Sequence, residues 1–284
     1  DPAGNNNAAA TDFTFTYETT APTVTITSAD VNTGGSHNGA TTMIFTFSEE
    51  MTGIADGDFT FTNCAAGTFS VETANTVFHQ VCTPSTNGAT VTVAVAASKG
   101  TDPAGNNNAA ATDFTFTYDT TAPTMTITST TVSSGATTND ATIALVFTSS
   151  ESTANLVSGD VTLSAGSISS SFAGSGSSYS ATFTPSGDAT FTISIAAGTF
   201  TDAAGNNNAV SNSFTWTYDS TALTMTIASS TSGVTSGATT NDATIALTFT
   251  SSETTTDLVV GDITLSAGAL SSFAGSGTDY TATF

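Results

Sequence analysis

The sequence repeats itself with a period of about 100 residues, and this repeat limits the possible folds more than any other feature. The stretch DPAGNNNAAATDFTFTY occupies residues 1–17 and recurs unchanged at 102–118, and the close variant DAAGNNNAVSNSFTWTY occupies 202–218. A second block, SGATTNDATIAL, occurs at 134–145 and again at 236–247. Such a period is too long for one turn of a solenoid and matches the size of a single β-sandwich domain.

Apolar and polar residues alternate within each copy, which is the pattern of strands with one buried face. In the second copy, Phe191, Ile193 and Ile195 fall on one face of a strand, and Thr192 and Ser194 fall on the other. Threonine suits exposed strand positions because its branched side chain is already restricted at χ1. The pattern predicts seven strands in this copy, at 123–129, 141–149, 160–166, 168–173, 178–184, 189–196 and 212–219.

Seven short strands joined by Gly, Asn, Ser and Pro turns predict an all-β chain of tandem immunoglobulin-like β-sandwiches in a linear array. We assign residues 21–121 and 122–221 to two such domains and 222–284 to an incomplete third domain. Residues 1–20 match the last strand and linker of a preceding domain. A segment of a longer repetitive chain would have such ends. The alternative, completion of the third domain by a strand of a neighbouring molecule, is disfavoured because the two partial pieces together fall short of one repeat.

A family resemblance follows from the pattern TDAAGNNN…FTWTYDSTA, which is preceded by the segments GDVTLSAG and YSATFTP. This pattern resembles the bacterial-type Ig-like tandem repeats of large extracellular surface proteins and adhesins, and similar units occur in algal extracellular proteins. The resemblance implies an Ig-like fold, an extracellular or cell-surface location and a role as a spacer or fibre, with calcium common at the domain junctions. The sequence departs from its own pattern where Leu223 replaces the proline found at Pro22 and Pro123.

The charge balance excludes several classes of partner. The chain has Lys+Arg 1 and Asp+Glu 23, which gives a formal net charge of -22. A protein with one cation cannot neutralise phosphates, so nucleic-acid binding and contact with an anionic membrane surface are excluded. No apolar run approaches the roughly 18 residues of a membrane-spanning helix, so we expect no membrane insertion in this segment.

The D-x-A-G-N segment has two interpretations. It predicts a turn, in which the aspartate accepts local backbone hydrogen bonds and the glycine takes a positive φ. It also offers carboxylate and amide oxygens, the ligands that Ca²⁺ prefers, close to acids that precede the domain junctions. The candidate calcium ligands are Asp102, Asn106, Asp119, Asp202, Asn206 and Asp219. Further acids that could approach a junction are Glu18, Glu49, Glu50, Glu151 and Glu253.

The two cysteines, Cys64 and Cys82, lie in the first unit only. Aligning VCTP with TFTP places Cys82 at the core-facing position of Phe183. We expect a disulfide between adjacent parts of the sandwich, which would contribute about 3 kcal/mol in the chain-entropy model and would indicate an oxidising compartment. The alternative is a pair of buried free thiols.

Catalysis is not expected. His37 and His79 have no triad-like companion, and His79 alternates with the core-facing residues Phe78 and Gln80, which makes it a solvent-facing strand residue. Acid pairs are present, but no pair stands out as the two carboxylates that glycoside hydrolysis requires. Lys99 has no feature that supports a nucleophilic role.

The sequence therefore predicts a structural extracellular protein, a repetitive Ig-like stalk or fibre. Its expected partners are further copies of itself in a fibre or filament and O-linked glycans on Thr or Ser, because the chain has no Asn-x-Ser/Thr sequon. The alternative is an adhesion module that binds glycans or another surface through its loops.

Overall fold

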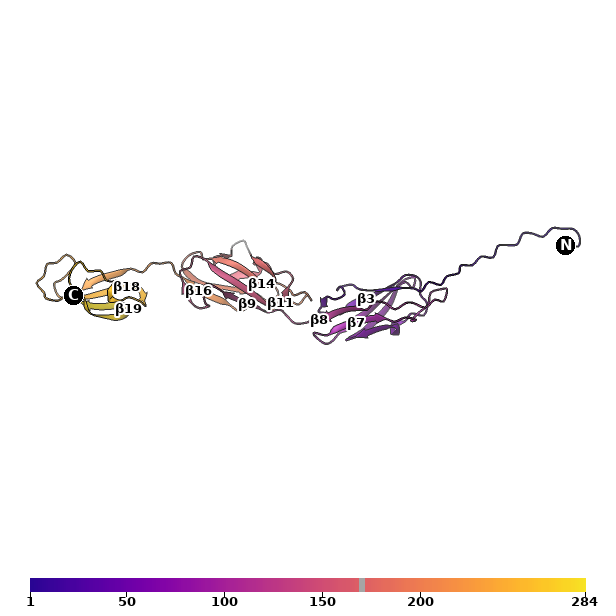
Figure 1. Cartoon of the computed structure of the whole chain (residues 1–284), viewed down its shortest axis with the longest axis horizontal. Helices are drawn as coiled ribbons and strands as arrows, with labels where there is room; N and C mark the ends of the chain where they lie inside the picture. Colours follow the sequence, from indigo (N-terminus) through magenta and orange to yellow (C-terminus); the bar gives the residue numbers. More distant parts are fainter. Residues whose placement is uncertain (169–171) are drawn as a thin grey trace. The chain divides into compact units, whose positions relative to one another are not determined.

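The computed structural model of the chain describes residues 1–168 and 172–284. The chain forms two compact units, Asp1–Tyr218 and Asp219–Phe284. The first unit contains two separate hydrophobic cores, each enclosed by two sheets (Figure 1). We call the strands around the first core domain 1, those around the second core domain 2, and the strands of the second unit domain 3. The predicted domain boundaries stay predictions.

Domain 1 consists of two four-stranded sheets in the orders β1-β3-β6-β5 and β2-β8-β7-β4. All neighbouring strands are antiparallel except β2 and β8, which are parallel. The inward-facing residues of both sheets, including Met43, Phe45 and Phe116, form one buried cluster. The strands are β1 (Val24–Ser28), β2 (Ser36–His37), β3 (Thr41–Phe47), β4 (Phe59–Thr62), β5 (Cys64–Thr73), β6 (Val77–Pro84), β7 (Thr90–Val95) and β8 (Phe114–Tyr118).

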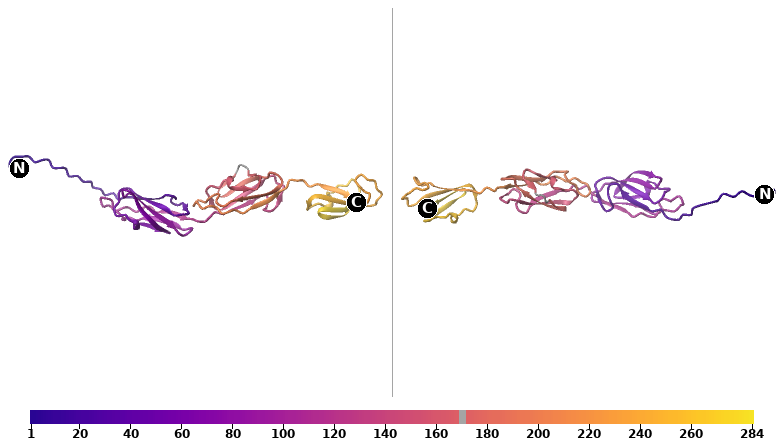
Figure 2. Two further views of the ribbon diagram at one scale, coloured as in Figure 1. Left: turned by 180° about the vertical axis from the view of Figure 1, so that it is seen from behind. Right: turned by 90° about the horizontal axis from the view of Figure 1, so that it is seen from above.

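Domain 2 repeats this architecture, with sheets in the orders β13-β14-β11-β9 and β10-β16-β15-β12. Its core contains Trp216, Phe147 and Phe183, all of which are fully buried. Figure 2 shows both domains from two further sides. The strands are β9 (Met125–Ser129), β10 (Thr137–Thr138), β11 (Ile143–Thr153), β12 (Val161–Leu163), β13 (Ser167–Ile168), β14 (Ala173–Thr184), β15 (Ala189–Ile195) and β16 (Phe214–Tyr218).

The predicted fold class is confirmed, and the strand predictions need three corrections. Strand β10 was not expected, because two residues are too few for alternation to detect. The strand expected at 160–166 is only β12, because Ser158–Asp160 forms a 3₁₀ turn. Part of the strand expected at 168–173 falls on residues 169–171, outside the described residues. Strand β14 begins earlier than expected, because its first residues are glycine and serine and carry no apolar signal.

Each unit also has a short 3₁₀ turn closed by an aspartate. In Asp56–Asp58, the carboxylate of Asp58 accepts a hydrogen bond from the Ala55 N–H at 2.9 Å, and Asp160 and Asp262 do the same in Ser158–Asp160 and Val260–Asp262. No helix of the described chain is long and apolar enough to cross a membrane.

Domain 3 has one three-stranded sheet, β17 (Met225–Ser229), β18 (Ala246–Thr255) and β19 (Ser271–Thr283). Its small core includes Phe249 and Tyr280, while Ile227 is 58% exposed. Residues 1–20 contain no strand, and Phe13, which would face a core in the other copies, is 90% exposed. The assignment of this segment to a preceding domain stays a prediction.

Candidate metal centre

The D-x-A-G-N segment forms the turn that its sequence predicts. The Gly105 N–H donates to the Asp102 carbonyl at 3.1 Å, and Gly105 has a φ of 93°. One carboxylate oxygen of Asp102 accepts the Asn106 backbone N–H at 2.8 Å, and the other accepts the Asn106 side-chain N–H at 2.8 Å. Asp202 and Asn206 form the same bonds in domain 2. The turn therefore fixes one buried carboxylate at the same place in each domain.

The third asparagine of each AGNNN segment anchors the turn to the domain. The Asn108 oxygen accepts the backbone N–H groups of Lys99 and Gly100 at 2.8 and 3.1 Å, and its nitrogen donates to the carbonyls of Ala96 and Ala109 at 2.9 and 2.8 Å. Asn108 is 2% exposed, so these bonds satisfy a buried amide. We did not predict this role, although the invariance of NNN between the copies was a visible signal.

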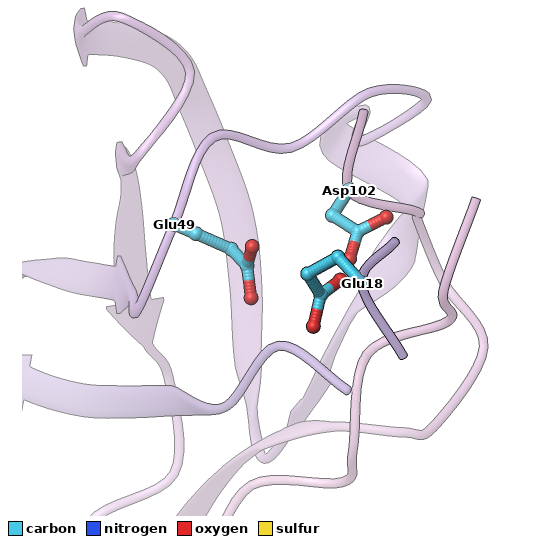
Figure 3. A group of neighbouring side chains, drawn as sticks. All are labelled: Glu18, Glu49 and Asp102. Carbon is cyan, nitrogen blue, oxygen red and sulfur yellow. The ribbon is translucent and has the colours of Figure 1, made fainter. Parts of the chain in front are cut away.

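Three acids from different parts of the chain meet beside the turn of domain 1. Glu18 comes from the segment before β1, Glu49 from the loop after β3, and Asp102 from the turn itself. Carboxylate oxygens of all three lie within 4.8 Å of one another. Figure 3 shows Glu49 pointing toward Glu18 and Asp102, which lie side by side. The arrangement joins the linker to the body of the domain through three negative charges.

Domain 2 contains the equivalent cluster. Asp119 comes from the linker between the domains, Glu151 from β11 and Asp202 from the second turn, and their carboxylate oxygens also lie within 4.8 Å of one another. The Asn206 side-chain nitrogen donates to the Asp119 carbonyl at 2.8 Å, which fastens the linker to the turn. The same three-acid cluster thus recurs at the same place in two successive copies.

The protonation equilibria reflect this crowding of charge. Burial raises the pKa of Glu49, and the charges of Asp102 and Glu18 raise it further. Burial likewise raises the pKa of Glu151, with added contributions from Asp119 and Asp202. These shifts show that each cluster holds more negative charge than its surroundings compensate.

Asp102 behaves differently from Glu49. Burial favours its neutral form, but hydrogen bonds from the side chain and backbone of Asn106 outweigh this effect, so the pKa of Asp102 is lowered. Asp102 is therefore held as a charged acceptor.

The structure brings together only part of the predicted ligand set. Asp102, Asp119 and Asp202 belong to the two clusters. Asn106 and Asn206 lie beside them, but each directs its amide nitrogen, rather than an oxygen, at the neighbouring aspartate. Three glutamate and aspartate positions from the predicted junction group lie outside both clusters: Glu50, Asp219 and Glu253. The chemistry of the clusters fits a calcium ion, because all three donors in each are carboxylates.

The cysteines and the other singled-out residues lie apart from these clusters. The structure joins Cys64 on β5 to Cys82 on β6 by a disulfide with a Cα–Cα distance of 5.7 Å. The His79 Nε2 atom lies 2.9 Å from a carboxylate oxygen of Glu72, and the Lys99 ammonium lies 3.8 Å from Asp58. In the described residues, neither contact places a histidine beside the acidic clusters.

The repeated sandwiches define this chain as a protein of tandem immunoglobulin-like domains. A model of the bacterial Ig-like domain family matches residues 18–118 and 119–218, which together make up more than half of the sequence, so the chain belongs to that family.

Three solved structures have a similar chain trace. The I9–I11 tandem from titin is 8% identical, with 92% of this chain and 88% of that chain covered and a TM-score of 0.28. The adhesin InvE of Yersinia pseudotuberculosis is 14% identical, with coverages of 69% and 58% and a TM-score of 0.26. InvD of the same organism is 15% identical, with coverages of 81% and 69% and a TM-score of 0.33. The comparison with curated proteins found no match.

Proposed function

We propose that this chain is a structural segment of an extracellular surface protein, in which tandem Ig-like domains act as a stalk and calcium fastens each linker to the domain that follows it. The observation that carries this proposal is the recurrence of one cluster, a linker acid together with two acids of the domain, in both complete copies. A linker that is fixed to a domain transmits position along a stalk, whereas a free linker does not.

The cluster geometry supports calcium over a purely structural role for the acids. Ca²⁺ takes six to eight oxygen ligands at roughly 2.3–2.6 Å, and three carboxylates can supply up to about six oxygens. Without a cation, the like charges of Glu18, Glu49 and Asp102 repel the linker from the domain. A bound divalent cation reverses this effect, so the same residues would hold the linker in place.

Other features of the chain agree with an extracellular stalk. A disulfide persists in oxidising compartments, and a net charge of -22 opposes collapse and close association. We assign the chain no catalytic role, because its histidines and its lysine pack into the sheets and turns already described. Self-association into a fibre and O-linked glycans on Thr or Ser stay predictions, which imaging of the native assembly and mass spectrometry would test. Loop-mediated adhesion to glycans is the alternative, which a glycan array would reveal.

Calorimetric titration of the full chain with calcium tests the proposal. We expect one site for each cluster, and Glu49→Gln should remove the site of domain 1 while leaving that of domain 2. Glu50→Gln is the matched control, because it removes the same charge from the next residue, outside the cluster. A flat titration, or equal losses in the two variants, would show that calcium does not occupy the clusters.

Small-angle scattering of the same samples tests the stalk itself. Calcium should leave the particle extended and should narrow its distribution of dimensions, because fixed linkers restrict the domains. A compact particle in calcium would contradict the stalk independently of where the ion binds.

A further inference from the structure

The outer edge of the first strand is the clearest difference in surface between the two complete domains. Strands β1 and β9 each lie at the end of a four-stranded sheet, so one side of each has no neighbouring strand. Alternate residues of an antiparallel strand bond to the neighbour, and the registers place the backbone groups of Ile26 and Ile127 on the outer side. The two isoleucines thus occupy equivalent positions on equivalent edges.

In domain 2, the side chain of Asn212 closes this edge. Its oxygen accepts the Ile127 N–H at 2.7 Å, and its nitrogen donates to the Ile127 carbonyl at 3.0 Å. An amide carries a donor and an acceptor side by side, so Asn212 replaces one residue of a neighbouring strand. Ile127 is 1% exposed as a result. Natural sheets commonly block their edges in this manner, because an open edge is a template for pairing with another chain.

Domain 1 has no such cap. Aligning TDFTFTY with NSFTWTY places Thr112 at the position of Asn212, and Asp113 at the position of Ser213. Within the described part of the chain, no side chain bonds to the backbone of Ile26, which is 8% exposed. A groove of ≈ 200 Å³ runs along this edge and is lined by Val24, Thr25, Ile26, Thr33, Thr112, Asp113 and Phe114.

We propose that the open edge of β1 binds an extended segment of another protein as an added strand, and that this segment carries a lysine or arginine beside Asp113. The backbone N–H and carbonyl of Ile26 supply the pair of hydrogen bonds that Asn212 supplies to its own domain. Asp113 is exposed and lines the groove. With a net charge of -22 and Lys+Arg 1, a second copy of this chain is repelled, whereas a cationic strand is attracted.

Hydrogen exchange of the free protein tests the open edge directly. The Ile26 amide should exchange faster than the Ile127 amide, because only Ile127 is bonded to a side chain. Thr112→Asn should slow exchange at Ile26, and Asn212→Thr should speed it at Ile127. Equal protection of the two amides in the wild-type chain would overturn the proposal.

Peptide binding tests the occupant. The probe is a short capped peptide that alternates threonine and valine around a central lysine, and it is titrated into the full chain while backbone amide shifts are recorded. We expect shifts at Ile26, a loss of affinity of about tenfold or more in Thr112→Asn, and a second binding site in Asn212→Thr. Asp113→Ser, which installs the residue of domain 2, should weaken this peptide but not one with glutamine in place of lysine.

Two results would contradict the proposal. Binding that Thr112→Asn leaves unchanged would show that the peptide does not occupy the β1 edge. Concentration-dependent self-association that Thr112→Asn abolishes would show that a second copy, rather than a cationic partner, adds to the strand. Both variants exchange residues that the other domain already uses, and Asn212→Thr remains informative if Thr112→Asn unfolds domain 1.

Discussion

Domains 1 and 2 fill the same part of their cores in two different ways. Domain 1 joins β5 to β6 through the Cys64–Cys82 disulfide. In domain 2, the register of β13 with β14 places Gly166 at the position of Cys64, while Phe183 occupies the position of Cys82. A Cβ atom added to Gly166 would lie 2.3 Å from the Phe183 ring. The ring therefore occupies the space that a side chain at residue 166 would need.

This comparison shows that the two positions must change together. A phenylalanine fits only opposite glycine, and a cysteine at one position needs a cysteine at the other. Domain 3 contains the same combination as domain 2, because a Cβ added to Gly268 would lie 2.5 Å from the Phe284 ring. A covalent bond and a buried aromatic ring are thus interchangeable solutions, each contributing roughly 2–3 kcal/mol.

Truncation of the ring should have the largest effect. Phe183→Ala should destabilise domain 2 by about 3–5 kcal/mol, because Phe183 is fully buried and packs at 4.8 Å, centroid to centroid, against Trp216. Denaturant unfolding followed by tryptophan fluorescence measures this domain selectively, since the chain has Trp 1.

Val157→Ala is the control for this measurement, because Val157 is 56% exposed and its truncation should change little. If Phe183→Ala were equally mild, the ring would not be the counterpart of the disulfide.

Removal of the disulfide should have the next largest effect. The double variant Cys64→Ala and Cys82→Ala should destabilise domain 1 by about 3 kcal/mol, because it releases a loop with a sequence separation of 18. Calorimetry should show one transition moving to lower temperature, while the Trp216 fluorescence midpoint of domain 2 stays constant.

The double variant Cys64→Gly and Cys82→Phe sharpens the same experiment. It installs the solution of domain 2 in domain 1 and should recover part of the lost stability. A recovery of zero would mean that neighbouring residues, such as Val91 at the position of Phe191, also determine which solution fits.

The glycine should be the next most sensitive position. Gly166→Ala should destabilise domain 2 by about 1–3 kcal/mol, because the added methyl group overlaps the Phe183 ring and residue 166 has a φ of 79°. Combining it with Phe183→Ala separates the two causes. The overlap disappears in the combined variant, so any cost that persists beyond that of Phe183→Ala belongs to the backbone.

Sequence patterns predicted the features that repeat along the chain and missed those that depend on pairing between strands. The period identified the sandwich, and the alignment of VCTP with TFTP identified Cys82 with Phe183. The link between Gly166 and Phe183 was not visible, because it depends on the register of β13 with β14. A one-residue shift in that register would pair different residues.

The candidate metal centre was predictable to a similar degree. Position along the chain placed Asp102, Asp119 and Asp202 near the junctions, where the structure brings them together with glutamates. It could not show that Asn106 presents its nitrogen to Asp102, because the two ends of an amide are indistinguishable in a sequence. Nor could it separate Glu49 from Glu50, since adjacent residues differ only in the direction their side chains take.

A second core position distinguishes the domains by a smaller margin. The Tyr179 hydroxyl lies 2.6 Å from the Thr153 hydroxyl, and Thr153 also bonds to the Gly176 carbonyl at 3.2 Å. Domain 1 has Phe78 and Met51 at these two positions, which form an apolar pair without a hydrogen bond. Because Thr153 donates to Gly176, its oxygen accepts from Tyr179.

Tyr179→Phe should therefore cost domain 2 only about 1 kcal/mol, because Thr153 keeps its bond to the Gly176 carbonyl. Thr153→Val should cost more, since it leaves the buried Tyr179 hydroxyl without its partner. The double variant should cost less than the sum of the two, because it approaches the apolar pair of domain 1. Tryptophan fluorescence during denaturant unfolding gives all three values. Strict additivity would mean that the two hydroxyls stabilise domain 2 separately, and that the exchange between apolar and hydrogen-bonded pairs is not coupled.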